Sequence, residues 1–475
     1  MEDYTVTYEN LRLAPFKVEH IVALSLSKSV NEHGTLEVTA ILSEEIGDQY
    51  IYLVKNLMPV TLSDRNGPGK EEILFKGLVT NINISKSGNV YYMQLSAKGS
   101  TCLMAVERKS RSFQDVTMTT HRLIGEIIAG YEGADVLIQI PDEPIGSLLV
   151  QYQETDWEFL KRLVSRYGAV LISDICMDGI AIFAGVADRG ESHKISAFQY
   201  TVRKSIESYE LMKKNGWPDA NEIEYIVFEV ENPRVFAIGT QVELDGKQLF
   251  IEQAWHTLND GVLHNLYLLK LKEGFRSLKA YNTMLVGSSV SGKVVEVSRD
   301  RVMVDLDIDG PGRAAYWFPY STMSASPDGS GWYCMPEKGD GVRVYFPTKE
   351  EGEAYAVSAI SGHKPAAGDN NDPMGDPNVK YLATVHQKVI KFAEEGIIIN
   401  ADNGQATVFL GKDGKLLLYG AQKVEVAAEE EVSIMAKNNV TIAAQNLVTL
   451  KNGLSHINVY KSGNVIIKGT KVYSN

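Results

Sequence analysis

An eight-residue repeat between Val408 and Leu450 constrains this chain more than any other feature of its sequence. Two apolar columns recur at this spacing. The first column contains Val408, Leu416, Val424, Val432, Val440 and Val448, and the second contains Leu410, Leu418, Val426, Ile434, Ile442 and Leu450. Residues two apart on a strand face the same side of a sheet, and an even period keeps that side from one repeat to the next. Each octad therefore predicts a short strand with one apolar face, followed by a polar turn.

Two architectures fit this period. Eight extended residues reach at most roughly 26 Å at ~3.3 Å per residue, which is too short for one chain to circle a packed core. An up-and-down meander would use each octad for one strand and its turn, but its apolar face would need a cover. Alternatively, three chains wind around one axis as an intertwined β-helix or β-prism and bury both columns, with a gross gain on the order of 50–100 kcal/mol before entropy is subtracted. Such a rod would be stiff, which favours a mechanical role.

Length and composition predict a folded protein of about three domains. The 475 residues are 44% hydrophobic and 23% charged, which is ordinary for a globular chain. The net charge of −13 argues against a nucleic-acid partner, whose phosphates favour a basic surface. The first residues, Met1 to Tyr4, lack an apolar segment, so we expect synthesis in the cytoplasm without a signal peptide. Cys102, Cys176 and Cys334 fit neither a disulfide framework nor a zinc site.

Local patterns divide the chain into four parts. Residues 1–285 are β-rich, with one helix expected over about 120–131 and another beginning at a Thr155–Glu158 capping box. Residues 286–365 contain five or so short strands separated by Gly, Asp and Pro, which predict a small barrel of the oligonucleotide/oligosaccharide-binding (OB) type. Residues 366–379 are predicted to be a linker. Residues 380–475 contain the octads and are predicted to be a needle.

The sequence offers little chemistry. It contains no hydrolase, zinc-protease or phosphate-binding motif, so we predict no catalytic residue, no cofactor and no enzymatic activity. Asp305, Asp307 and Asp309 alternate along an expected strand, and a solvated face is preferred there over a calcium site.

His456 is the one weak metal candidate. It falls eight residues after Val448 in the first column, so three imidazoles would converge on a threefold axis and could bind a metal ion. A one-residue shift of the register near this point makes it equally plausible that Ile457 points inward instead.

Three segments resemble a known family, the hub-and-spike proteins of contractile injection systems. These include the spike complexes of contractile phage tails and the valine-glycine repeat (VgrG) proteins of type VI secretion. The first segment, 152–163, is similar to the family's hub motif through Thr155, Asp156, Trp157, Glu158, Leu160 and Arg162. The second resembles its spike barrel through Trp317, Pro319, Pro336, Gly339 and Asp340. The octads resemble its β-helical needle.

The resemblance implies a mainly β chain in which residues 1–285 form a hub of two barrel-like β domains with a few helices. The hub would be a homotrimeric ring that docks on the tail tube protein, and the needle would pierce the target cell envelope when the sheath contracts. Baseplate proteins and a separate spike-tip protein would be further partners, in a phage tail-like particle made in the bacterial cytoplasm. The alternatives are a trimeric receptor- or glycan-binding tail fibre and a spike-borne cell-wall hydrolase.

Overall fold

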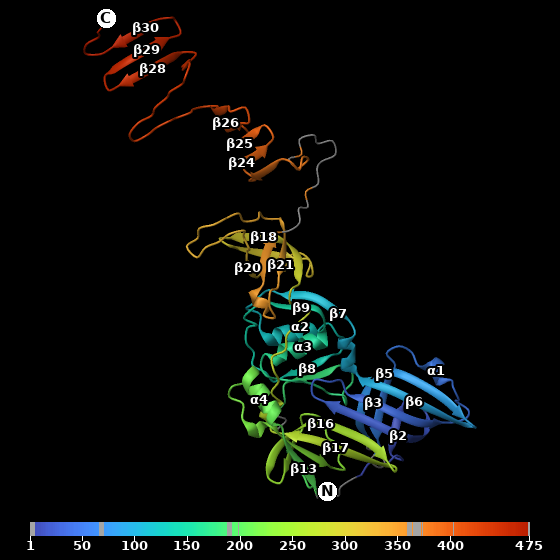
Figure 1. Cartoon of the computed structure of the whole chain (residues 1–475). Coiled ribbons are helices and arrows are strands. Elements are labelled where there is room, and N and C mark those ends of the chain that lie inside the picture. Colours follow the sequence, from blue (N-terminus) through green and yellow to red (C-terminus); the bar gives the residue numbers. More distant parts are fainter. Residues whose placement is uncertain are drawn as a thin grey trace. The chain divides into compact units, whose positions relative to one another are not determined.

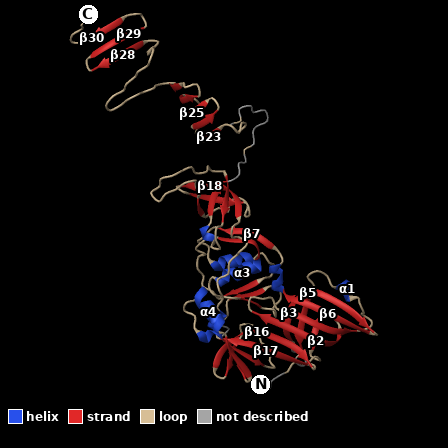
Figure 2. Ribbon diagram, in the orientation of Figure 1, coloured by secondary structure: helices blue, strands red, loops and turns tan. Residues whose placement is uncertain are grey.

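The computed structural model describes residues 5–65, 71–187, 192–197, 199–358, 363, 372, 374–401 and 403–473. The chain is mainly β (Figures 1 and 2), as predicted. It divides into two compact units, Met1–Gly362 and His363–Asn475. Half of the predicted linker, 366–379, lies outside the described residues.

The first part of unit one is a β domain with its own apolar core. Strands β5 and β6 are its longest hairpin, and side chains alternate between core and solvent along β3. Its elements are β1 (Leu11–Ala14), β2 (Val18–Ser29), β3 (Thr35–Leu42), α1 (Tyr50–Leu53), β4 (Pro59–Asp64), β5 (Glu72–Ser87) and β6 (Val90–Gly99).

A second β domain follows later in the chain and has a separate core. Its elements are β12 (Ser192–Ile195), β13 (Tyr200–Lys204), α4 (Ile206–Asn215), η2 (Glu222–Tyr225), β14 (Ile226–Glu231), β15 (Gln241–Leu244), β16 (Lys247–Asn259), β17 (Val262–Lys270) and η3 (Lys272–Phe275). Strand β16 pairs with β2 of the first domain. Among the described residues the two domains thus share one twelve-stranded sheet.

An α/β insert, residues 100–187, lies between the two β domains in sequence. Both predicted helices are present there: α2 (Thr120–Ile128) and α3 (Asp156–Ser165) bury their apolar faces in one core. The sequence reading missed α4, whose apolar face is weak. The other elements of the insert are η1 (Ser100–Ala105), β7 (Arg108–Phe113), β8 (Asp135–Ile138), β9 (Leu149–Thr155), β10 (Leu171–Ser173) and β11 (Ala181–Ala184).

Five strands after the second β domain form a closed ring of neighbours. They are β18 (Ser289–Ser298), β19 (Arg301–Leu306), β20 (Trp317–Pro319), β21 (Gly341–Tyr345) and β22 (Tyr355–Ser358), with η4 (Glu351–Glu353) before the last. Their order is β20-β19-β18-β21-β22, and a parallel bridge from Tyr320 to Ala356 joins the two ends. This is the arrangement that the predicted small barrel requires.

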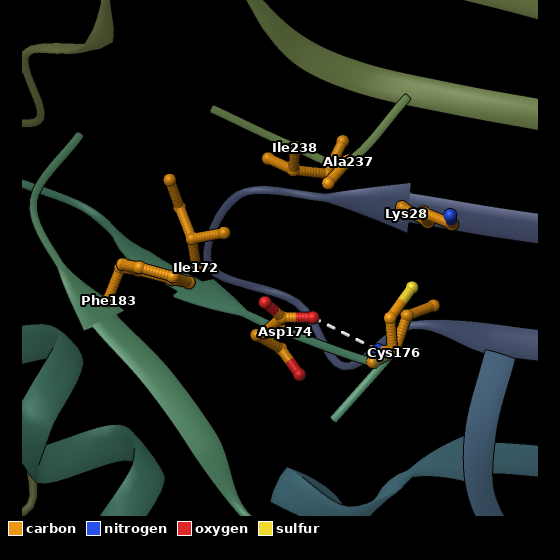
Figure 3. A pocket seen from close by; sticks show the side chains of 9 residues that line it. Lys28, Ile172, Asp174, Cys176, Phe183, Ala237 and Ile238 are labelled. Carbon is orange, nitrogen blue, oxygen red and sulfur yellow. Dashed lines mark hydrogen bonds between the residues drawn. The ribbon is translucent and has the colours of Figure 1, made fainter. Parts of the chain in front are cut away.

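The seam between the two β domains contains buried polar groups. His256 on β16 is almost fully buried, and its Nδ1 lies 2.8 Å from Asn265 Oδ1. Burial, together with the nearby Lys28 charge, lowers the pKa of His256 to about 3. Lys28 itself lines a small pocket with Asp174 and Cys176 of the insert (Figure 3), and burial lowers the pKa of its ammonium group. Both β domains and the insert meet here.

We expect His256 to make the protein acid-sensitive. The folded state keeps the imidazole neutral, so its contribution is present above the unfolded pKa of 6.5 and is lost as the pH falls toward 3. Lowering the pH from 7.5 to 5.0 should reduce the free energy of unfolding by roughly 2 kcal/mol through this one group. Denaturant titrations of the wild type and of His256→Gln would measure it. An equally steep pH dependence in His256→Gln would contradict the assignment.

Unit two begins with a five-stranded antiparallel meander. Its strands are β23 (Lys380–Ala383), β24 (Val389–Ala393), β25 (Gly396–Ala401), β26 (Ala406–Gly411) and β27 (Leu416–Gly420). Val408 pairs with Leu418 and Leu410 with Leu416, so both predicted columns share one face. The apolar residues of that face are Leu382, Ile390, Phe392, Ile397, Ile399, Val408, Leu410, Leu416 and Leu418. We name it the column face.

Residues 421–446 differ from the meander on either side. The structure describes this whole segment and assigns it no strand. No backbone N–H within 422–446 donates to another group of the described chain. The column residues here are among the most exposed apolar side chains, with Val424 at 56% and Ile434 at 71%. The expectation of one paired strand per octad is therefore wrong for this segment within a single chain.

A three-stranded meander follows, with β28 (Leu447–Asn452), β29 (Ser455–Tyr460) and β30 (Val465–Lys468). Its register decides between the two orientations considered for the region after Val448. Val448 pairs with Val459, and Leu450 pairs with Ile457. Ile457 therefore continues the apolar face, as expected if the register shifts by one residue here.

Candidate functional site

The motif that resembles the hub of the family lies where β9 passes into α3. Thr155 is the N-cap: its hydroxyl accepts a hydrogen bond from the Glu158 backbone N–H at 3.2 Å, and the Glu158 carboxylate accepts one from the Thr155 N–H at 2.9 Å. This is the predicted capping box. Gln153, just before it, has a left-handed backbone with φ of 48°, and such strain concentrates at functional sites.

Replacing Thr155 with alanine should destabilise the insert by about 1 kcal/mol, because the first turn of α3 loses its side-chain acceptor. Thr155→Ser keeps the hydroxyl and should behave like the wild type. Thermal or denaturant unfolding of the two variants measures the difference. Equal stability of Thr155→Ala and Thr155→Ser would show that the box contributes nothing.

Asp156 organises a buried cluster behind the cap. Its side chain is 1% exposed and forms salt bridges with Lys109 at 2.6 Å and Arg111 at 2.7 Å. Tyr131 and Gln151 also donate to it. Burial alone would raise the pKa of Asp156, but these donors outweigh it and hold the pKa below its ordinary value. Asp156 therefore remains ionised and fastens β7, β9 and α2 around the start of α3.

Arg162, two turns further on, connects the insert to the barrel. Its Nε and Nη2 each lie 2.9 Å from the Glu154 carboxylate, and its Nη1 lies 2.9 Å from Glu351 Oε1 in η4. Glu351 also accepts the Val150 backbone N–H at 3.0 Å. Burial raises the pKa of Glu351, and the Arg162 charge opposes that rise. All three side chains are about nine-tenths buried.

A second polar contact joins the same two parts. Asp309, after β19, accepts hydrogen bonds from the backbone N–H and the hydroxyl of Ser112 on β7. The Gln114 amide donates to Val304 O at 3.2 Å and accepts from the Ala315 N–H at 3.1 Å. Burial raises the pKa of Asp309. Asp309 is thus committed to the insert, and Asp305 accepts from the backbone of a following loop instead.

The barrel core also includes two side chains from the insert. Leu148 and Val150, at the start of β9, are fully buried with Val302, Val304 and Phe318 of the barrel. We define the junction as this shared core together with the Arg162 and Asp309 contacts. Polar bonds and apolar burial on both sides hold the insert and barrel in one geometry. The junction has the properties of a mechanical coupling.

The other predicted residues lie close to this junction or in its two cores. Trp157 is buried, and its ring lies 4.6 Å from that of His33 in the first β domain. Leu160 belongs to the core of the insert. In the barrel, Trp317 lies on β20 opposite Met303, and Pro319 lies opposite Arg301.

The Pro336–Asp340 turn leads directly into β21. Gly339 has φ of 97°, a left-handed conformation that favours glycine. Its N–H donates to Val294 O at 2.8 Å, and Asp340 accepts from the Glu337 N–H at 2.8 Å. The turn therefore fixes where β21 enters the barrel. Residues that sequence reasoning missed are Ser112, Gln114 and Glu351, which lie far from the motif in sequence.

The weak metal candidate does not continue the apolar column. His456 lies opposite Lys451 and Lys468, on the face of the β28–β30 sheet that does not carry Ile457. Within the part of the chain that the structure describes, no group of three His, Cys, Asp or Glu side chains could hold a metal ion. Cys102, Cys176 and Cys334 form no disulfide with one another. None of the described helices is long and apolar enough to cross a membrane.

Part of the chain matches a known protein family. Residues 30–179 match the family model of the phage tail baseplate hub (GPD). No curated protein matches the chain. The match covers most of the first β domain and the insert, including the whole hub motif.

Two solved structures share the fold. The E. coli c3393 protein, a type VI secretion component described as structurally similar to T4 bacteriophage tail proteins gp27 and gp5, superposes with a TM-score of 0.53. It is 13% identical, and the alignment covers 73% of this chain and 98% of that one. The Francisella PdpA–VgrG complex in its lidded form gives a TM-score of 0.53 at 8% identity, covering 84% of this chain and 76% of that one. At these low identities, the superpositions show a shared fold and no more.

Proposed function

We infer that this chain is a structural hub-and-spike protein of a contractile injection system. The observation that carries this is the baseplate hub match over residues 30–179, followed in the same chain by a barrel and an octad repeat. The junction adds a physical reason. A hub that must transmit thrust to a spike needs a stiff connection, and the buried Arg162 and Asp309 contacts supply one.

We propose that the functional form is a homotrimer intertwined through residues 421–446. In one chain this segment leaves its backbone N–H groups without a partner within the described chain and its columns exposed. When apolar side chains are buried, the backbone polar groups beside them need hydrogen-bond partners, which a neighbouring chain can supply. Two more copies, wound around one axis, would supply the hydrogen bonds and bury the columns together. The meander reading then applies only to β23–β27 and β28–β30.

The remaining assignments follow from that role. The hub would dock on the tail tube protein, contact baseplate proteins and close the tube, and the needle would pierce the target cell envelope. A separate spike-tip protein would cover the β28–β30 end, and a particle with a bare tip would contradict that partner. The protein would be incorporated in a phage tail-like particle. It would need no cofactor and would not act as an enzyme.

Deleting the gene in a strain that encodes it tests the role directly. A central hub nucleates the baseplate, so electron microscopy should show no complete particles, and complementation should restore them. A receptor- or glycan-binding fibre predicts complete particles that fail to bind cells. A spike-borne hydrolase predicts peptidoglycan clearing by the pure protein, which we do not expect.

A further inference from the structure

The β23–β27 meander is apolar on both faces, which a needle with a buried axis does not require. Opposite the column face, cross-strand pairs place Ile398 beside Phe409 and Phe409 beside Leu417. Tyr381 and Tyr419 lie on the same side, on the first and last strands. Leu417 and Tyr419 are 41% and 51% exposed. We name this second side the outer face.

The outer face is not uniformly apolar. Lys391 lies between Tyr381 and Ile398, and Asn400 pairs with Thr407. The matching side of the β28–β30 sheet carries the polar residues Thr449, Lys451, His456 and Asn458 together with Leu447, Tyr460 and Ile466. Its cross-strand rows mix polar and apolar side chains, whereas Ile398, Phe409 and Leu417 form one continuous apolar row across three strands of the β23–β27 meander. Exposed apolar surface of this kind marks an interaction site.

We propose that the outer face contacts the lipid of a bilayer. This rests on the trimer proposed above, in which the column faces turn inward and the outer faces are repeated three times around the shaft. A band on all sides suits a medium that surrounds the shaft, and a single protein partner would need only one side. Tyrosines at both ends of an apolar band suit the two edges of such a contact, because their rings favour the membrane–water interface.

The height of the apolar band limits how much of a bilayer it can span. Five strands spaced ~4.8 Å apart give a height of roughly 19 Å, less than the ~30 Å hydrocarbon core of a bilayer. The face therefore fits the interface and the adjoining part of one leaflet. Lys391 has a long apolar stem and can extend its ammonium group to water.

Flotation of the full-length protein with zwitterionic phosphatidylcholine vesicles tests this proposal. We expect the wild type to float with the vesicles at both low and high salt, since the contact is apolar. Ile398→Thr, Phe409→Thr and Leu417→Thr together should reduce the partition coefficient at least about tenfold, because threonine keeps the strand but removes apolar area. The reverse triple variant, Lys391→Ile with Asn400→Val and Thr407→Val, should increase it.

The mass of each variant by light scattering separates the possible failures. A trimeric wild type that does not float, or a threonine variant that floats equally well, would overturn the lipid contact and leave the hub-and-spike role intact. A threonine variant that loses its trimeric mass would show that the outer face is buried between chains, which also overturns it. A monomeric wild type would instead overturn the trimer on which the proposal rests.

Discussion

Replacing Val432 and Ile434 with aspartate should convert the trimer to monomers. Both side chains belong to the columns of the segment that is unpaired in one chain, and they are 50% and 71% exposed there. In the proposed trimer the double variant would bury six carboxylates near the axis. Each buried, unpaired charge costs several kcal/mol, so the trimer should lose on the order of 10–20 kcal/mol. Light scattering of the purified variant measures the outcome.

Ser433→Asp is the control, because it places an aspartate between the two column positions. Residue 433 has the opposite parity and should face water, so this variant should keep the mass of the wild type. If both variants have the same mass as the wild type, the octads of residues 421–446 are not a core between chains. The hub domain would be unaffected by that result.

Replacing Arg162 with alanine should destabilise unit one by about 3–5 kcal/mol. The substitution leaves Glu154 and Glu351 buried without the guanidinium that neutralises both. Removing one partner of a buried ion pair has this cost because the remaining charges are desolvated. We expect the barrel to lose its fixed geometry on the insert, since Arg162 makes the ion pair that joins the two parts. Denaturant unfolding gives the stability change, and limited proteolysis near Glu351 reports on the loosened junction.

Arg122→Ala provides the comparison within the same insert. Arg122 pairs with Glu126 one turn along α2, and both side chains are largely exposed. Such a surface pair is worth only about 0.5 kcal/mol. Similar losses in Arg122→Ala and Arg162→Ala would mean that burial at the junction adds nothing, and the junction would then not act as a coupling.

The sequence predicted those parts of the fold whose patterns are local. The capping box at Thr155 and the helical spacing after it are visible within four to twelve residues, and α2 and α3 are where they were expected. Strand alternation likewise placed the barrel. Helix α4 was missed because its apolar side chains form only a weak stripe, in which Tyr209 and Met212 are buried in a small cluster with Ala220 and Tyr225.

Local sequence patterns predict only one side of the Arg162 contact in the junction. Arg162 belongs to a recognisable motif, but its partner Glu351 lies 189 residues away, and no local pattern marks that glutamate. The pairing of β2 with β16, which joins the two β domains, is equally long-range. In the needle, the period predicted the shared face of Val408, Leu410, Leu416 and Leu418. A period of eight is compatible with pairing within one chain or between chains, and the structure uses the first only outside residues 421–446.

The mass of the full-length protein in solution tests the central claim most directly. We predict a species near three times 52.5 kDa, which persists in sodium dodecyl sulfate until it is boiled because the chains are intertwined. A fragment covering Lys380–Asn475 should be trimeric as well. A mass of 52.5 kDa for the full-length chain would contradict the trimeric needle, and the hub-and-spike assignment would then rest on residues 30–179 alone.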